Sequence, residues 1–166
     1  MDTMNPRDIQ TRLSEMRDAA VLMEIDNLVW DRQNTPAEKM EWESREKYLQ
    51  SCPPGNQIVA VIGEEIGGYI GFKPPTPLPS NAHVLELNIA IHPAYQRQGI
   101  GRVLMDALVQ LAAERGVRKL SLRVLSSNPG AVAFYESCGF VEQGRLVEEF
   151  WLDGQYVDDI FMWRKV

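Results

Sequence analysis

The sequence has only two cysteines, Cys52 and Cys138, too few for a disulfide-stapled fold and not in metal-ligand spacing. The two histidines, His83 and His92, complete no zinc-binding set, so no metal is expected. No apolar run approaches the roughly 18 residues of a membrane-spanning helix. The first residues lack the basic flank and apolar core of a signal peptide. We therefore expect a cytoplasmic protein without a membrane partner.

A basic stretch interleaved with aromatic residues is also missing, and the formal net charge is −6. This balance argues against nucleic acid as a direct partner. It suits a cationic substrate, although many proteins are acidic for solubility alone. A length of 166 residues predicts one domain, residues 1–166, and is compatible with a homodimer.

A strand-to-helix junction stands out among the features that are present. An apolar strand pattern over residues 84–91 is followed by a helical pattern that begins at Ile100 and stops at Gly116. Residues 96–101 between them read Gln-Arg-Gln-Gly-Ile-Gly. A loop of this kind turns backbone N–H groups toward one point, and the positive end of the helix favours an anion there.

The residues of this loop fit a pyrophosphate cradle. Gly99 and Gly101 would let a ligand approach the backbone, and Arg97 and Arg102 can supply positive charge. An ordinary turn with surface arginines is the alternative for an isolated Gly-x-Gly. A dinucleotide fingerprint would need glycine at Leu104, and a triphosphate-binding loop would need Lys and Ser or Thr after the second glycine.

A second segment follows the next strand pattern, residues 120–124. Ser127 or Asn128 suits a helix N-cap, Pro129 suits the first turn, and Gly139 suits the residue after the helix. Asn128 and Tyr135 are seven residues apart, which places them on nearly the same helical face.

Together, the two segments resemble the GNAT superfamily of acetyl-CoA-dependent N-acetyltransferases. The resemblance is carried by Gln96-x-x-Gly99-x-Gly101 and then by the following series after the next strand: Asn128, Ala131, Tyr135, Gly139 and Phe140. It implies an α/β fold with a mixed, largely antiparallel sheet, a splayed parallel strand pair and flanking helices.

The resemblance also implies a co-substrate, acetyl-CoA, and the residues that hold it. The pantetheine arm would lie against the backbone of Ile89, Ala90 and Ile91, and the Asn128 side chain would bond the same region. Tyr135 would stand near the thioester sulfur as general acid, with aromatic packing as its alternative role. The pyrophosphate would bind the amides of Arg97, Gln98, Gly99, Ile100, Gly101 and Arg102.

The chemistry of transfer requires a base as well as an acid, because the attacking amine must lose a proton. Glu86 is the candidate base, since it is the carboxylate in an otherwise apolar strand. A surface or salt-bridged role for Glu86 is equally open, and Asn88 can mark a bulge that re-aims its neighbours. In the ribosomal-protein alanine acetyltransferases, which the segment also resembles, an acidic base stands where this chain has Arg123.

These observations and the resemblance predict an N-acetyltransferase that moves an acetyl group from acetyl-CoA to a primary amine, which attacks directly in a ternary complex. The expected acceptor is a cationic small molecule, and the partner is an amine-bearing small molecule or peptide. A non-catalytic acyl-CoA sensor and a protein N-terminal acetyltransferase remain alternatives. A thiol enzyme built on Cys138 lacks a histidine partner, and packing is the expected role of that side chain. Four acidic residues of the last hairpin can form an acidic rim or stay solvated: Glu148, Glu149, Asp158 and Asp159.

The remaining segments predict further elements. Residues 8–13 form a short strand, and residues 16–30 and 36–49 form two helices, the second with a capping box at Thr35 and Glu38. Trp30 and Trp42 pack in the core or shape an acceptor pocket. Two hairpins are expected, turning at Gly63-Glu64 and at Asp153-Gly154.

Overall fold

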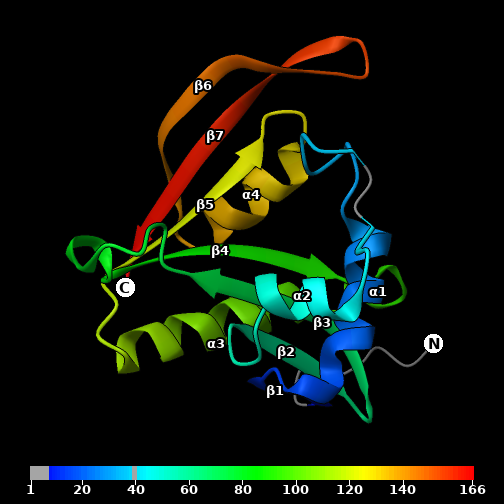
Figure 1. Ribbon diagram of the computed structural model, residues 1–166. Helices are drawn as coiled ribbons and strands as arrows, with labels where there is room; N and C mark the ends of the chain where they lie inside the picture. The colour runs from blue at the N-terminus through cyan, green and yellow to red at the C-terminus, as the bar shows by residue number, and fades with distance from the viewer. Residues whose placement is uncertain (1–7, 39–40) are drawn as a thin grey trace. The chain divides into compact units, whose positions relative to one another are not determined.

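The computed structural model describes residues 8–38 and 41–166 and has a mixed α/β fold (Figure 1). One seven-stranded sheet has the order β1-β2-β3-β4-β5-β7-β6, with β4 and β5 parallel. The strands are β1 (Ile9–Leu13), β2 (Gln57–Ile62), β3 (Glu65–Lys73), β4 (Val84–Ile91), β5 (Lys119–Leu125), β6 (Val141–Leu152) and β7 (Gln155–Lys165). The α-helices are α1 (Ala19–Val29), α2 (Arg45–Ser51), α3 (Ile100–Glu114) and α4 (Pro129–Ser137). Short 3-10 turns are η2 (Met16–Asp18), η3 (Pro79–Asn81) and η4 (Pro93–Tyr95). Among the described helices, none is long and apolar enough to cross a membrane.

The described residues fall into two compact units. Unit 1 holds residues 8–29, 41–73 and 88–111, and unit 2 holds residues 30–38, 74–87 and 112–166. The chain passes from one unit to the other within β4 and again within α3.

Unit 1 is built on the antiparallel strands β1, β2 and β3. The first hairpin turns at Gly63-Glu64, as expected from the sequence. Helix α1 places its buried residues on one stripe and contacts β3 and α2. That stripe comprises Ala19, Leu22, Ile25 and Asp26, which return to one face at helical spacing.

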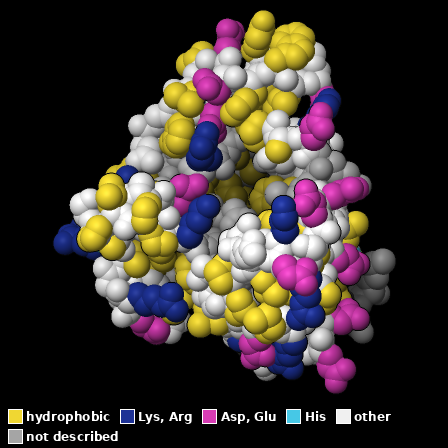
Figure 2. Space-filling view, viewed as in Figure 1, with side chains coloured by type: hydrophobic (Ala, Val, Ile, Leu, Met, Phe, Trp, Pro, Cys, Tyr) yellow, Lys and Arg dark blue, Asp and Glu magenta, His cyan; other side chains and the backbone are white. Residues whose placement is uncertain are grey.

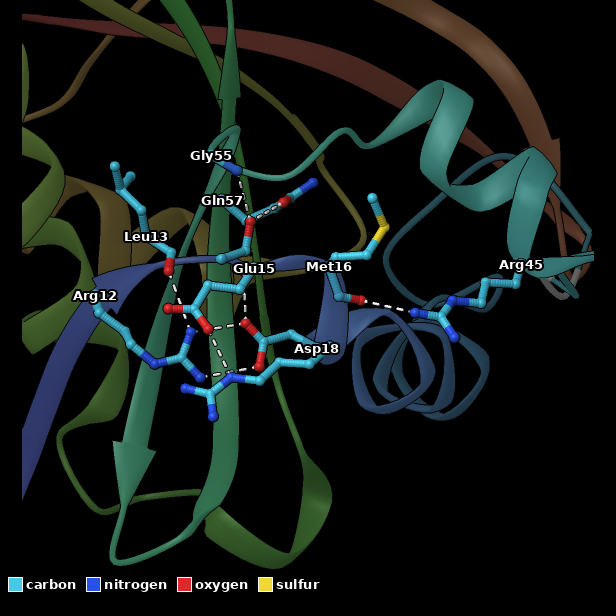
Figure 3. Close-up of polar contacts among 10 residues, drawn as sticks. Arg12, Leu13, Glu15, Met16, Asp18, Arg45, Gly55 and Gln57 are labelled. Carbon is cyan, nitrogen blue, oxygen red and sulfur yellow. Dashed lines mark hydrogen bonds and ion pairs between the residues drawn. The ribbon is translucent and has the colours of Figure 1, made fainter.

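A polar network fixes the chain between β1 and α1 (Figure 3). Both terminal nitrogens of Arg12 donate to the buried Asp18 carboxylate, at 2.7 and 2.9 Å. The Glu15 amide donates to the same carboxylate at 2.7 Å. The buried Ser14 hydroxyl donates to Gln57 at 2.5 Å, which ties the turn to β2. The start of α1 is therefore held by hydrogen bonds as well as by packing.

Unit 2 contains β5, β7 and β6 as antiparallel neighbours, and α4 contacts β5. The last hairpin turns at Asp153 and Gly154, both at positive φ, which confirms the predicted turn. Hydrophobic side chains gather at the top of Figure 2, where Figure 1 draws this hairpin turn. Trp151 and Tyr156 stack edge to face there, 4.8 Å apart, and both are exposed.

The predicted second helix, residues 36–49, is wrong in its position. Helix α2 begins after Ser44, whose hydroxyl accepts from the Lys47 amide and caps the helix. Thr35 instead accepts from the Ala37 amide in a local turn, so the expected capping box with Glu38 does not form. Residues 39–40 of the predicted helix lie outside the described residues.

Replacing Asp18 tests the network at the start of α1. Arg12 holds the pKa of Asp18 below its usual range, so the ionised carboxylate stabilises the fold at neutral pH. We expect Asp18→Asn to lower the free energy of unfolding by about 1–3 kcal/mol at pH 7. Because the folded-state pKa is depressed, this difference is complete above a carboxylate's ordinary pKa of about 4. It shrinks as pH falls through the folded-state pKa.

Denaturant unfolding of both proteins between pH 3 and pH 7 measures the difference. Arg17→Ala is the control, because Arg17 pairs with Glu15 at an exposed position and should cost less than about 0.5 kcal/mol. An Asp18→Asn difference that does not change with pH would contradict the assigned role of the charge.

Candidate active site

The loop between β4 and α3 has the backbone that an anion cradle requires. Arg97 has a φ of 62° and Gly99 a φ of 80°, so the chain turns through the left-handed region twice before the helix. The Val103 amide makes the hydrogen bond back to the Gly99 carbonyl, at 3.2 Å. The amides of Ile100 and Gly101 precede that bond and stand at the positive end of α3.

Both predicted arginines of the cradle are exposed, yet their surroundings differ. Arg102 lies 3.5 Å from Asp106, one helical turn away, in an exposed ion pair. Arg97 forms no ion pair with any carboxylate in the part of the chain that the structure describes, and its side chain is exposed beside the loop. A Cβ at Gly99 would meet nothing within 4 Å, so conformation rather than space requires glycine there.

Strand β4, which precedes the loop, is paired with β5 over only its first residues. Parallel pairing of β4 with β5 joins Val84, Leu85 and Glu86 to residues 119–121 and reaches no further. Residues 89–91 then lead to His92, whose amide donates to the Gly67 carbonyl of β3 at 2.9 Å. His92 also accepts a hydrogen bond from the Ala94 amide through Nδ1, so its side chain stabilises the turn after β4.

Asn128 caps α4 with its side chain. Its Oδ1 accepts from the Ala131 amide at 3.2 Å, and Pro129 follows in the first turn. Gly139, at a φ of 87°, follows the helix, as the sequence predicts. The side-chain NH₂ of Asn128 takes no part in this cap.

Tyr135 lies on the same helix and is almost completely buried. Its ring packs against Phe134 and Phe140, at centroid distances of 5.5 and 6.0 Å. Burial raises the pKa of the Tyr135 phenol, so the phenol keeps its proton at neutral pH. A protonated hydroxyl is the form that a general acid requires.

Glu86 is half-buried on β4 and belongs to the electrostatic surroundings of Arg123 in unit 2. Arg123 donates through Nε and a terminal nitrogen to Asp159, which is buried on β7. This ion pair raises the pKa of Arg123, with a smaller contribution from Glu86. The charge of Arg123 is therefore neutralised by Asp159. Glu86 of β4 is a further carboxylate that acts on Arg123 without being its main partner.

Two of the four acidic residues considered for a rim on the last hairpin are paired with arginines. Asp159 pairs with Arg123, and Asp158 pairs with Arg145 and accepts from the Glu148 amide. Glu148 itself has a φ of 52°, within an irregular part of the β6–β7 ladder. The sequence gives no local sign of these pairs, because the partners come from different strands.

Two further expectations concern cysteine and metal. Cys138 is buried at the end of α4, which agrees with a packing role. In residues 8–38 and 41–166, no group of three or more histidine, cysteine or acidic side chains is arranged around a cation position.

Sequence reasoning missed the buried carboxylates of Asp18, described above, and of Asp26 on α1. Asp26 accepts hydrogen bonds from the Tyr69 hydroxyl at 2.5 Å and from the Trp42 indole at 2.9 Å. A signal for it exists in the sequence, because an acidic residue follows Ile25 on the apolar stripe of a predicted helix.

The sequence is similar to those of known acetyltransferases. A family model described as Acetyltransferase (GNAT) family matches residues 22–140. Over 74 residues the chain is 45% identical to a spermidine N(1)-acetyltransferase of Vibrio cholerae, covering 44% of this chain and 43% of that enzyme. Over 55 residues it is 53% identical to a ribosomal-protein-alanine N-acetyltransferase of Escherichia coli, covering 33% of this chain and 37% of that enzyme. The chain thus spans less than half the length of these two relatives.

A solved structure extends the likeness to nearly the whole chain. It belongs to a Streptococcus mutans protein that is 32% identical and has a TM-score of 0.85, covering 94% of this chain and 98% of that one. The predicted α/β fold with a parallel strand pair is confirmed.

Two substitutions at Asn128 distinguish the contribution of its capping oxygen to stability from that of its side-chain NH₂ group. We expect Asn128→Ala to lower the free energy of unfolding by about 0.5–2 kcal/mol, because the Ala131 amide loses its acceptor. Asn128→Asp keeps an acceptor of the same shape at the helix start and should stay close to wild type in stability. Thermal unfolding of the three proteins measures this, and equal losses in both variants would contradict the cap assignment.

Proposed function

Because the chain belongs to the GNAT acetyltransferase family, we propose that it moves an acetyl group from acetyl-CoA to the primary amine of a cationic small molecule. The amine attacks the thioester directly in a ternary complex. The observation that carries the proposal is the β4–α3 loop, where two left-handed residues and the start of a 15-residue helix form an anion site.

The proposal assigns each part of acetyl-CoA to a set of residues. The pyrophosphate binds the amides of residues 97–102, and the pantetheine arm bonds the backbone of residues 89–91. These β4 residues lie beyond the parallel ladder with β5, so their backbone groups on that side are not used by it. The amide NH₂ of Asn128 contributes a further hydrogen bond.

The acid and the base of the reaction are also assigned. Tyr135 gives its proton to the departing thiolate of CoA, which its buried, protonated phenol favours. Glu86 takes the proton of the attacking amine, directly or through water. The C–S bond of the thioester breaks as the amide C–N bond forms, and no metal takes part.

The cationic acceptor is supported by charge and by one relative. The net charge of −6 attracts cations, and the matched Vibrio cholerae enzyme is named for spermidine, a polyamine. A protein N-terminus is the second acceptor class, because the matched Escherichia coli enzyme is named for a ribosomal-protein alanine. An arginine at position 123, bound to Asp159, disfavours that class, since the base expected there is acidic.

Turnover with a panel of amines tests the proposal. Acetyl-CoA is mixed with spermidine, an L-amino acid or an alanine-initiated peptide, and free CoA is followed. We expect CoA release with the polyamine to exceed release with the other two. Binding without any release would instead support a non-catalytic acyl-CoA sensor, and fastest release with the peptide would support N-terminal acetylation.

Acetyl-CoA binding is tested by replacing a glycine with glutamate, once before α3 and once after it. Acetyl-CoA at 100 times its dissociation constant should stabilise the wild type by about 2.7 kcal/mol. Gly99→Glu should abolish this shift, because it adds a negative charge at the cradle. Gly116→Glu is the matched control, since Gly116 has a similar φ of 74° and open space but lies after the helix.

Tyr135→Phe tests the general acid. We expect kcat to fall by about 10²–10⁴, the range for a lost general acid, while acetyl-CoA affinity stays near wild type. Folding should be little affected, because the ring packing on Phe134 and Phe140 is kept. Steady-state kinetics with isothermal titration of acetyl-CoA make the measurement, and unchanged kcat would remove Tyr135 from the mechanism.

Glu86→Gln provides the comparison for that variant. A lost base should depress kcat/KM most at neutral pH and less as pH approaches the amine's own pKa, near 10. Tyr135→Phe should not show that recovery. If the pH profile of Glu86→Gln keeps the wild-type shape, another group or solvent takes the proton.

A further inference from the structure

Four side chains of unit 1 form a hydrogen-bonded chain that begins inside the protein and ends at an exposed position. Trp42 and Tyr69 donate to opposite oxygens of the buried Asp26 carboxylate. The Asn88 Nδ2 then donates to the Tyr69 hydroxyl oxygen over a longer distance of 3.4 Å. Asn88 is exposed on β4, immediately before residues 89–91.

The chemistry of the groups fixes the direction of this chain. An ionised carboxylate only accepts hydrogen bonds, so the Tyr69 hydroxyl proton points to Asp26. The Tyr69 oxygen can then only accept from Asn88, which must turn its nitrogen inward. An asparagine amide can take either of two flipped orientations. Here the hydrogen bond to Tyr69 selects the one in which the Asn88 carbonyl oxygen is directed away from Tyr69.

The space around Asn88 agrees with this orientation. A Cβ at Gly71 of β3 would overlap Asn88 Oδ1, so the glycine leaves the room that the amide occupies. Within the described part of the chain, no protein donor is paired with Asn88 Oδ1. The Asn88 carbonyl oxygen, on an exposed residue of β4, thus occupies the space that a side chain at position 71 would need.

The buried charge strengthens that acceptor. Burial raises the pKa of Tyr48 and of Cys52, and the Asp26 charge adds to both shifts. The same negative charge polarises the hydroxyl and the amide that follow it, because hydrogen bonds in series reinforce one another. An ammonium group is the donor that such an acceptor favours most.

We propose that Asn88 Oδ1 accepts a hydrogen bond from the nitrogen of the acceptor amine, and that Asp26 and Tyr69 are positioning residues that aim it. Asn88 lies one residue before the backbone assigned to the pantetheine arm, so adjacent residues of one strand bind the amine and the arm that carries the thioester. This inference rests on the proposed function, and it names the group that recognises the substrate amine.

Asn88→Ala removes the acceptor at an exposed position where folding should not suffer. We expect KM for spermidine to rise about 10- to 100-fold, as for a lost hydrogen bond to a charged group, with kcat and acetyl-CoA affinity near wild type. If another amine of the panel turns over best, it replaces spermidine in this test.

Asp26→Asn keeps the series of hydrogen bonds from position 26 to Asn88 but reverses the direction in which its members donate. The Trp42 indole is only a donor, so the amide introduced by this substitution must give its oxygen to Trp42 and its NH₂ to Tyr69. Tyr69 then donates to Asn88, whose amide reverses and presents a donor outward. We expect KM to rise in the same range as for Asn88→Ala.

Adding Trp42→Phe separates positioning from a structural role. Without the indole, the amide that replaces the Asp26 carboxylate is free to give its oxygen to Tyr69, which restores the original direction. KM of Asp26→Asn/Trp42→Phe should therefore return toward wild type, although the double variant is less stable than either single one. A purely structural role of Asp26 predicts the opposite order.

The outcomes are distinguishable from failure of the proposed function. No CoA release by wild type with any amine overturns the proposed function, and this inference falls with it. Release by wild type, with a KM in folded Asn88→Ala that equals wild type, overturns the inference alone. A double variant whose KM is no better than that of Asp26→Asn overturns the role of Asp26, whereas the predicted order of KM values supports the whole chain.

Discussion

The early end of the parallel β4–β5 ladder is the constraint on which the rest depends. Only Val84, Leu85 and Glu86 pair with β5, and the strand nevertheless continues to Ile91. Backbone groups of a strand need partners, so those beyond the ladder must be satisfied by water or by a ligand on that side. A complete ladder would leave no backbone for the pantetheine arm. The sheet therefore leaves part of β4 unpaired with its parallel neighbour, and the proposed function places the pantetheine arm at that part.

Local signals predict the parts of the site that are made by backbone. The start of α3 at Ile100 and the caps of α4 lie where glycine, proline and asparagine predict them. The second predicted helix is misplaced because two hydroxyl residues compete for the role of N-cap. Thr35 precedes a proline and closes a turn, whereas Ser44 takes the cap. Which of the two starts a helix depends on packing that sequence spacing does not show.

Charged residues are the parts that the sequence could not resolve. Arg123 and Asp159 are 36 positions apart, and Tyr69 and Asp26 are 43 apart, so no local pattern links them. Strand register brings Arg123 and Asp159 to neighbouring strands, two positions out of step, because Arg123 lies opposite Phe161. The acidic hairpin consequently looks more charged in sequence than it is, because Asp158 and Asp159 each have an arginine. A carboxylate on an apolar helix stripe is the one such feature visible in advance.

Two neighbouring parts of the chain present hydrogen-bonding groups of opposite kind: donors at the start of α3 and an acceptor at Asn88. After β4, the helix start presents N–H groups and favours a phosphate. At Asn88, the hydrogen bonds that start at the buried Asp26 carboxylate end at an exposed residue, whose carbonyl oxygen we propose as the acceptor for an amine. Asn88 is uncharged, whereas the loop before α3 carries the exposed side chain of Arg97, and the first turn of α3 carries that of Arg102. In the proposed reaction, an anionic cofactor and a cationic acceptor bind within a few residues of each other. Fixed dipoles suit such neighbouring sites, because they act over short distances and full charges act over longer ones.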